Sequence, residues 1–195
     1  MSKDLTKVQA FIQQFLPLTS QEWDALAGLF TFQQYAKKAY LVQEGVYAQQ
    51  FAFVQQGVLR AFYRNTKGEE YNKTFFVEGD FVGALSSLVT QSPTAIPIQC
   101  LTSCDLLVAN YKDFTALFDR YPKMERLARL LAEQYFVRKE QREIELVTLE
   151  AKERYPIFQE AYPTLEQLIP QYHIASYLGI SATQLSRIRA ARLLK

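Results

Sequence analysis

Three side chains near the end of the chain have the types and spacing needed to recognise a polar ligand. Ser186 and Arg187 lie three and four residues after Thr183, so all three share one face if this segment is helical. An arginine can donate two parallel hydrogen bonds to a planar pair of acceptors, such as O6 and N7 of guanine, and a serine hydroxyl can bond a base or a phosphate. These residues therefore favour nucleic-acid recognition over catalysis.

The surrounding segment, residues 170–190, has the pattern of two short helices joined by a tight turn. Pro170 suits a first helical position, and Gly179 ends the first helix. Ser181 and Gln184 form a capping-box pattern, so a second helix is expected to begin directly after the turn. The pattern is typical of a helix-turn-helix, whose second helix enters the major groove of DNA. The inward faces would be formed by Ile174, Ala175, Leu178, Leu185 and Ile188.

Charge distinguishes this interpretation from an ordinary helical hairpin with a solvated polar face. Residues 167–195 contain four cations and no Asp or Glu, although the whole chain has a formal charge of only +2. Basic charge gathered on one small element is typical of nucleic-acid binding. Arginines and lysines beyond the central face are assigned to phosphates. The predicted DNA contacts are Ala182, Thr183, Gln184, Ser186, Arg187, Arg189, Arg192 and Lys195.

The composition fits one large or two small folded domains, because 49% of the 195 residues are hydrophobic and can form a core. No run approaches the ~18 apolar residues that a membrane span needs. The first residues, MSKDLTKVQ, lack the basic and apolar pattern of a signal peptide. We therefore expect a soluble cytoplasmic protein without a membrane partner.

The two cysteines do not indicate a metal site or a cofactor. On one continuous strand Cys100 and Cys104 would lie ~13 Å apart, too far for a disulfide. A hairpin turn at Thr102–Ser103 would instead let them face each other. Two thiols without further ligands form neither a zinc nor an iron–sulfur site. We predict reduced core thiols, with no metal and no cofactor.

Residues 39–108 have the pattern of a small antiparallel β-structure. Short segments rich in β-branched and aromatic residues alternate with turns, and glycines recur at positions 45, 57, 68 and 79. Strands this short favour a jelly roll or barrel. The expected strands are YLVQ, FAFVQQ, VLRAFYR, EYNKTFFV, DFVGAL, IPIQCL and DLLVANY.

Helical patterns flank these strands on both sides. Residues 4–16 have apolar residues at helical spacing, and Ser20 can cap a second helix. Beyond the strands, a short helix containing Phe114 is expected to stop near Tyr121, before a proline. Two further helical pieces are expected within residues 151–169.

Between them, residues 122–149 contain neither glycine nor an internal proline and predict one long helix. A helix this long rarely stands alone, which favours packing against a second copy of the chain. The alternative is that the helix covers the chain's own β-structure. We expect dimer contacts at Leu127, Leu131, Tyr135 and Ile144.

The order of a small β-roll, a long helix and a terminal helix-turn-helix resembles the Crp/Fnr family of bacterial transcription regulators, over about residues 30–191. GDFVGAL at residues 79–85 looks like the family's phosphate-binding cassette. IASYLGI at residues 174–180 and LSRI at residues 185–188 look like its recognition module. The resemblance implies an α+β fold with a jelly-roll-like sensor domain, a dimerisation helix and an all-α helix-turn-helix domain.

The same resemblance divides the chain into three parts. Residues 1–121 would hold the N-terminal helices and a cyclic-nucleotide-binding-like roll. Residues 122–150 would form the dimerisation helix, and residues 151–195 the DNA-binding domain.

Two departures from the family affect the expected DNA contacts. Ser186 and Arg187 match the pair that the Fnr branch places in the major groove, but Thr183 stands where the family usually has a Glu that accepts from cytosine. The family's known operators are therefore not carried over. Many relatives also add a β-hairpin wing after the recognition helix, whereas this sequence ends at Lys195. Backbone contacts are expected from other segments, such as residues 150–172.

A third departure concerns the effector. Cyclic-nucleotide binders in the family use a Glu for the ribose and an Arg for the cyclic phosphate. Extending the cassette without gaps places Ala84 and Thr94 at these positions, and a phosphate without its bidentate guanidinium loses its strongest contact. We therefore expect independence from cyclic AMP. A degenerate pocket for an unidentified small molecule would be lined by Gly83, Ala84, Leu85, Ser86, Thr94 and Ala95.

The expected function is that of a homodimeric regulator that binds a palindromic DNA site, with RNA polymerase as a further candidate partner. One alternative is a regulator that depends on an unidentified small ligand. Another is a sensor or protein-interaction module with no specific DNA site. An enzyme is not expected, because the single histidine, His173, lies outside the roll, and metal or Ser–His sites need more ligands.

Overall fold

The computed structural model describes residues 3–193. The chain forms two compact units, one of Met1–Arg60 with Phe75–Tyr135 and one of Ala61–Thr74 with Phe136–Lys195. Helix α5 (Pro122–Thr148) contributes to both units. The domain boundaries expected at residues 121 and 150 are a different division of the chain and stay predictions.

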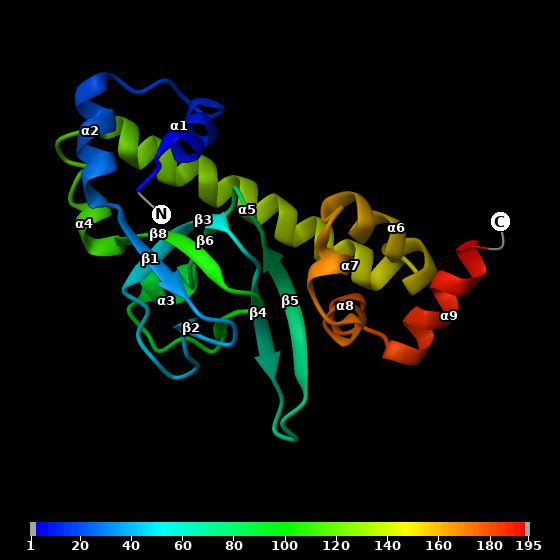
Figure 1. Cartoon of the computed structure of the whole chain (residues 1–195). Helices are drawn as coiled ribbons and strands as arrows, with labels where there is room; N and C mark the ends of the chain where they lie inside the picture. Colours follow the sequence, from blue (N-terminus) through cyan, green and yellow to red (C-terminus); the bar gives the residue numbers. More distant parts are fainter. Residues whose placement is uncertain (1–2, 194–195) are drawn as a thin grey trace. The chain divides into compact units, whose positions relative to one another are not determined.

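The strands form two four-stranded sheets, of order β1-β8-β3-β6 and β2-β7-β4-β5 (Figure 1). The pairings β1–β8, β3–β8, β3–β6 and β2–β7 are antiparallel, as expected for a β-roll. The strand bounds within residues 3–193 are β1 Thr31–Tyr35, β2 Tyr40–Val42, β3 Gln50–Gln56, β4 Leu59–Arg64, β5 Glu70–Phe76, β6 Phe81–Val82, β7 Ile98–Cys100 and β8 Cys104–Asn110.

The helices lie before and after the strands, as the apolar spacing predicted, with one exception inside the roll. Helix α5 confirms the predicted long helix, since it begins at Pro122 and ends at Thr148, one residue before the predicted end. The helix bounds are α1 Thr6–Gln13, α2 Ser20–Leu29, α3 Leu85–Thr90, α4 Tyr111–Thr115, α5 Pro122–Thr148, α6 Ala151–Ala161, α7 Leu165–Leu168, α8 Gln171–Leu178 and α9 Ala182–Leu193. No helix among residues 3–193 combines the length and the hydropathy of a membrane span.

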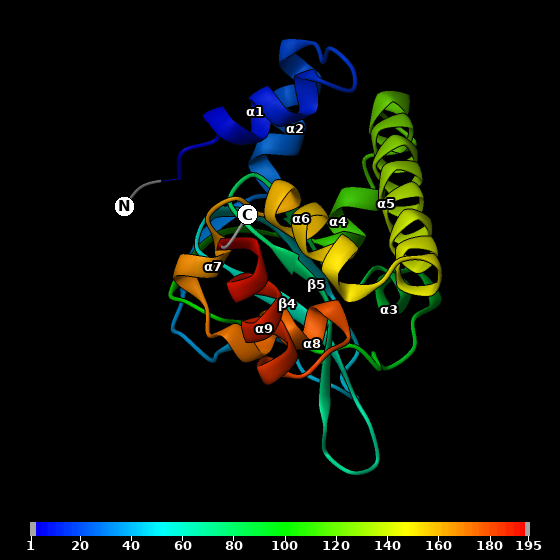
Figure 2. The ribbon, with the colours of Figure 1, turned by 90° about the vertical axis from the view of Figure 1, so that its right-hand side faces the viewer.

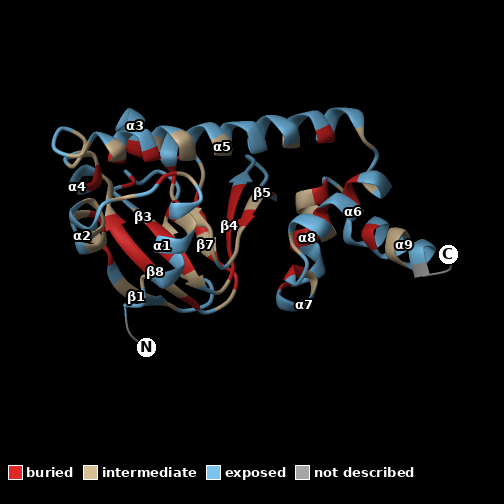
Figure 3. Cartoon of the chain, turned by 90° about the horizontal axis from the view of Figure 1, so that it is seen from above, coloured by how far each residue is buried: buried red, intermediate tan, exposed pale blue. Residues whose placement is uncertain are grey.

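The core of the first unit lies where the first sheet meets the N-terminal helices. In this sheet Leu107 of β8 pairs with Phe32 on one side and with Phe53 on the other. Leu107 and Phe53 are fully buried, and α1, α2, α4 and the first turns of α5 pack onto them (Figure 3). Burial of large apolar side chains is the main term that stabilises such a unit.

The structure corrects the prediction that DFVGAL is a strand throughout. Only Phe81–Val82 is extended, and helix α3 begins at Leu85. Ala84, Ser87 and Leu88 are buried whereas Leu85 and Ser86 are exposed, and burial at i, i+3 and i+4 is the period of a helix rather than of a strand. The hydroxyl of Ser87 fixes the helix by accepting from the Ala48 N–H at 3.0 Å.

Strand β1 and the geometry around the cysteines were also not predicted. The chain crosses from the second sheet to the first between Cys100 and Cys104, so the segment is neither one strand nor a hairpin. Both thiols are free and buried, which confirms the predicted core thiols. They hydrogen-bond to each other, and this bond together with burial raises the pKa of Cys100.

The cap of α2 is Thr19 and not the predicted Ser20. The Thr19 hydroxyl accepts from the Glu22 N–H at 3.3 Å, and the Glu22 carboxylate accepts from the Thr19 N–H at 2.7 Å. This reciprocal pair is a capping box, which satisfies two amide groups that the helix itself leaves unpaired.

We expect Thr19→Ala to lower the free energy of unfolding by about 1 kcal/mol, the usual value for a lost N-cap. Ser20→Ala is the matched control, and we expect it to change stability by less than about 0.5 kcal/mol. Urea unfolding of both variants measures the difference. Equal losses in the two variants would contradict the assignment of the cap.

Candidate nucleic-acid interface

The two helices predicted around Gly179 are present, and local hydrogen bonds define the turn between them. Gly179 ends α8 in the left-handed region with φ +71°, a conformation that glycine adopts without strain. Helix α9 then begins with the predicted capping box. The Ser181 hydroxyl accepts from the Gln184 N–H at 3.2 Å, and the Gln184 side chain accepts from the Ser181 N–H at 2.9 Å.

The inward faces of α8 and α9 pack as the sequence predicted. Ile174 and Leu178 of α8 and Leu185 of α9 are fully buried, and Ile188 is half-buried. Burying these side chains fixes the rotation of α9 about its axis. The rotation decides which residues of α9 face outward.

The outward face of α9 carries the three residues singled out from the sequence. Thr183, Ser186 and Arg187 are all exposed, and so is Ala182. Among residues 3–193 no hydrogen bond or ion pair joins the Arg187 side chain to another group. The structure therefore leaves one guanidinium and two hydroxyls on a rigid helix, free for an external acceptor.

Two of the predicted phosphate contacts also have partners within the protein. The Arg189 guanidinium lies 3.9 Å from the Glu166 carboxylate. Arg192 donates to the Gln159 side-chain oxygen at 2.9 Å and lies over the ring of Tyr155. Lys195 lies outside the described residues.

The acceptors of these arginines form a polar cluster on α6 and α7. Tyr155 donates to Glu166 at 2.7 Å, and Gln159 donates to the other Glu166 oxygen at 3.0 Å. Burial and the hydrogen bond to Glu166 raise the pKa of Tyr155 to about 12, so its hydroxyl keeps its proton as donor. The cluster holds α9 against α6 and α7.

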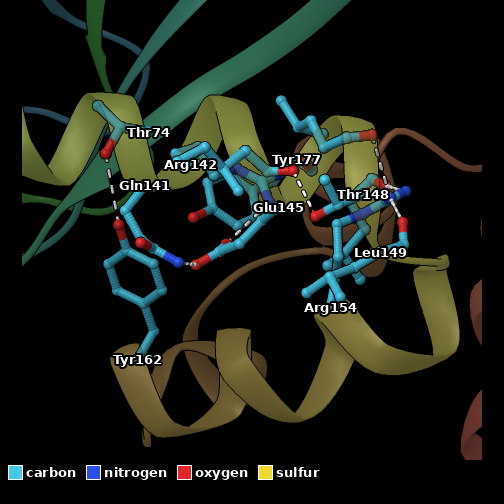
Figure 4. Close-up of polar contacts among 12 residues, drawn as sticks. Thr74, Gln141, Arg142, Glu145, Thr148, Leu149, Arg154, Tyr162 and Tyr177 are labelled. Atoms are coloured by element: carbon cyan, nitrogen blue, oxygen red, sulfur yellow. Dashed lines mark hydrogen bonds and ion pairs between the residues drawn. The ribbon is translucent and has the colours of Figure 1, made fainter.

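A buried arginine that the sequence analysis did not identify fixes the C-terminal end of α8. Arg154 of α6 is only 9% exposed, and it donates to three main-chain carbonyls (Figure 4). Two of them, Leu146 O and Leu149 O, belong to the end of α5. The third, Leu178 O at 2.8 Å, ends α8. Cations are favourable at helix C-termini, where carbonyls lack partners within the helix.

A second arginine binds the same C-terminal end of α8. Arg142 of α5 donates to Tyr177 O, and its guanidinium lies 4.0 Å from the centre of the Tyr177 ring (Figure 4). Glu145 balances its charge at 3.6 Å. Burial raises the pKa of Tyr177, which therefore stays neutral under the cation. Arg142 and Arg154 together fix α8 to the end of α5. No motif in the sequence marks either residue.

The positions predicted for an effector lie at and after α3. Thr94 is buried, and its hydroxyl donates to Ile96 O at 3.0 Å and accepts from Ile96 N at 3.1 Å. Gly83 lies so close to Phe51 that an added Cβ would meet the Phe51 Cβ at 3.1 Å. Ala84 is buried, whereas Leu85, Ser86 and Ala95 are exposed.

The structure places three of the four predicted dimer residues against their own protomer. Leu127 is buried in the core of the first unit, and Leu131 packs against that core. The Tyr135 hydroxyl donates to Phe81 O at 2.7 Å. These side chains already have partners because their face of α5 covers the roll. Ile144, in contrast, is 49% exposed.

Other apolar residues of α5 lie on the exposed side instead. Val137 is 61% exposed and precedes Ile144 by seven residues, so the two share one face of the helix. Figure 3 shows the second half of α5 exposed along most of its length. Gln141 lies between Val137 and Ile144 on the same face, and its side-chain amide donates to Glu145 at 3.4 Å.

Residues 32–121 match the model of the cyclic nucleotide-binding domain family. No curated protein matches the sequence. The fold is similar to that of FixK2 from Bradyrhizobium japonicum, with a TM-score of 0.75 and 15% identity over 83% of each chain. It is also similar to the c-di-GMP-responsive global regulator CLP of Xanthomonas campestris, with a TM-score of 0.70 and 14% identity over 90% of this chain and 92% of that one.

A third similar structure, from Eubacterium rectale, is described as a transcriptional regulator of the Crp/Fnr family. Its TM-score is 0.70 and its identity 14%, over 92% of this chain and 88% of the other. At such identities the likeness concerns the fold. The β-roll thus matches the cyclic nucleotide-binding domain family, and the chain has the fold of the Crp/Fnr regulators.

Proposed function

We propose that this chain is a sequence-specific DNA-binding transcription regulator of the Crp/Fnr type, with α8 and α9 as its helix-turn-helix. The observation that carries the proposal is the outward face of α9. There Arg187, with Ser186 beside it, is exposed and unengaged on a helix whose rotation is fixed by the buried Leu185. A guanidinium presented in this way suits O6 and N7 of guanine in the major groove.

The other predicted contacts take secondary roles in this proposal. Thr183 lies one turn before Arg187 and would reach a neighbouring base, while Ala182 sits at the helix N-terminus. Gln184 has its side-chain oxygen engaged in the capping box. Arg189 and Arg192 would add positive potential near the phosphates without direct contact, because the cluster on α6 and α7 holds them.

We further propose that two copies pair along the exposed face of α5. Val137 and Ile144 recur at the heptad spacing of a helical pair, and large apolar side chains this exposed are typical of interfaces. A two-fold pair would present two recognition helices to half-sites about 34 Å apart, so the operator would be palindromic.

We expect Val137→Glu to weaken self-association about tenfold or more, because pairing would bring two like charges together at an apolar seam. Lys139→Glu is the matched control on the same helix, away from the seam, and we expect it to leave the dissociation constant nearly unchanged. Sedimentation equilibrium of both variants measures the change. The proposed interface would be wrong if the two variants behaved alike.

Regulation by cyclic AMP is not part of the proposal. None of the six positions predicted for the effector carries a charged side chain, and the hydroxyl of Thr94 is already bonded to Ile96. A cyclic phosphate there would lack a bidentate cation. The roll could instead bind another small molecule.

Selection from a pool of random duplexes tests the proposed function. We expect the wild-type protein to enrich a palindrome and Arg187→Ala, made on an exposed position, to enrich none. Weak, salt-sensitive binding of all duplexes by both proteins, without enrichment, would contradict sequence-specific recognition by this chain in its free state.

A further inference from the structure

Residues 61–74, which form most of the β4–β5 hairpin, belong to the same compact unit as α8 and α9. Strand β5 is the last strand of its sheet, so one edge has main-chain groups without a neighbouring strand (Figure 2). Ser176 of α8 satisfies two of these groups. Its hydroxyl accepts from Asn72 N at 2.9 Å and donates to Glu70 O at 2.9 Å, as a neighbouring strand would.

A buried side-chain contact reinforces this docking. The Asn72 side-chain amide donates to His173 O at 2.8 Å, and its nitrogen lies 3.2 Å from His173 Nδ1. Asn72 and His173 are both only 6% exposed. His173 and Ser176 are three residues apart on α8, so both face the hairpin. A buried polar contact with its partners in place holds one specific arrangement.

The docked hairpin forms one wall of an open cavity of about 320 Å³. Glu69, Glu70 and Tyr71 contribute from the hairpin. The opposite wall comes from α8, from the turn after it and from the first residues of α9, including Tyr172, Ser181 and Gln184. The charged side chains that line the cavity are thus two carboxylates.

That opposite wall is the surface a DNA backbone would approach. In a helix-turn-helix complex the first helix crosses the phosphate backbone, and the N-terminal residues of the second helix meet the bases. The hairpin occupies the space beside both, and the Glu69 carboxylate on its wall of the cavity repels phosphates. Glu70 is ion-paired with Arg64 at 2.9 Å, whereas no ion pair within residues 3–193 engages Glu69.

We infer that the docked β4–β5 hairpin is an autoinhibitory element that must leave α8 before α9 can bind DNA. The inference rests on the proposed function and names its regulation. The hydrogen bonds of Asn72, His173 and Ser176 hold the hairpin on α8. DNA and the hairpin therefore compete for one surface.

Amide hydrogen exchange of the wild-type protein tests the inference without any substitution. In the free protein the main-chain N–H of Asn72 should exchange slowly, because it donates to the Ser176 hydroxyl. Addition of the selected duplex should speed its exchange by up to about tenfold, since the hairpin is released and about nine in ten molecules of the free protein are docked. Retained protection in the bound complex would overturn the inference and make the hairpin an additional DNA-contacting element.

Binding affinities give a second, independent readout. We expect Asn72→Ala to tighten DNA binding about tenfold, the gain for a docked state that about nine in ten molecules occupy. Lys67→Ala, at the exposed hairpin tip, should bind as the wild type does, whereas a tip that contacts DNA would bind more weakly. If Asn72→Ala binds no duplex while still folded, the proposed function fails with the inference. Binding with unchanged affinity overturns the inference alone.

Discussion

Replacement of Arg187 by lysine is expected to abolish sequence discrimination while leaving most non-specific affinity for DNA. Lysine keeps the positive charge, but it cannot form the two parallel hydrogen bonds that a guanidinium makes with O6 and N7 of one guanine. Loss of such a bidentate contact costs about 1 to 3 kcal/mol per half-site, which is a loss of about 5- to 150-fold in specific affinity.

The measurement compares the selected palindrome with a scrambled duplex over a series of salt concentrations. Non-specific binding arises from released counterions, so the salt dependence on the scrambled duplex should be nearly the same for Arg187→Lys and the wild type. Equal losses on both duplexes would show that Arg187 contributes charge alone, against the proposed base contact.

Replacement of Arg154 by methionine is expected to lower the free energy of unfolding by about 3 kcal/mol. The change keeps much of the side chain's volume but removes every donor to Leu146 O, Leu149 O and Leu178 O. Hydrogen bonds from a charged group contribute about 1.5 to 3 kcal/mol each, and the carbonyls left behind stay partly buried. Methionine's apolar packing offsets part of the loss.

Lys152→Met is the matched control, because it removes a cation from the same helix at an exposed ion pair with Glu150. Such pairs contribute little, so we expect a change below about 0.5 kcal/mol. Urea unfolding followed by far-UV circular dichroism measures both variants. A similar small effect of the two substitutions would mean that Arg154 does not hold the ends of α5 and α8 together.

The parts of the fold that local pattern determines could be predicted from the sequence. The long α5, the turn at Gly179 and the Ser181–Gln184 cap each follow from residue types a few positions apart, and the structure contains all three. Helix α3 was missed because it has only six residues and follows directly on the segment DFVGAL, whose short apolar pattern reads equally well as a strand.

Contacts between distant segments could not be predicted in the same way. Asn72 and His173 are 101 residues apart, and neither has a local pattern that indicates the other. Arg189 and Arg192 stay predicted phosphate contacts, and no local pattern indicated their partners Glu166 and Gln159. Leu127 and Tyr135 fit a dimer seam by spacing alone, yet the protomer's own roll covers them.

The most direct test of the central claim pairs a base substitution with a protein substitution. Each guanine of the selected half-site is replaced in turn by 7-deazaguanine, which lacks the N7 acceptor, and affinity is measured for the wild type and Arg187→Ala. We predict that one guanine position weakens wild-type binding about fivefold or more and leaves Arg187→Ala unchanged, since the variant has already lost that contact. Equal losses in the two proteins at every guanine would contradict recognition of DNA by Arg187.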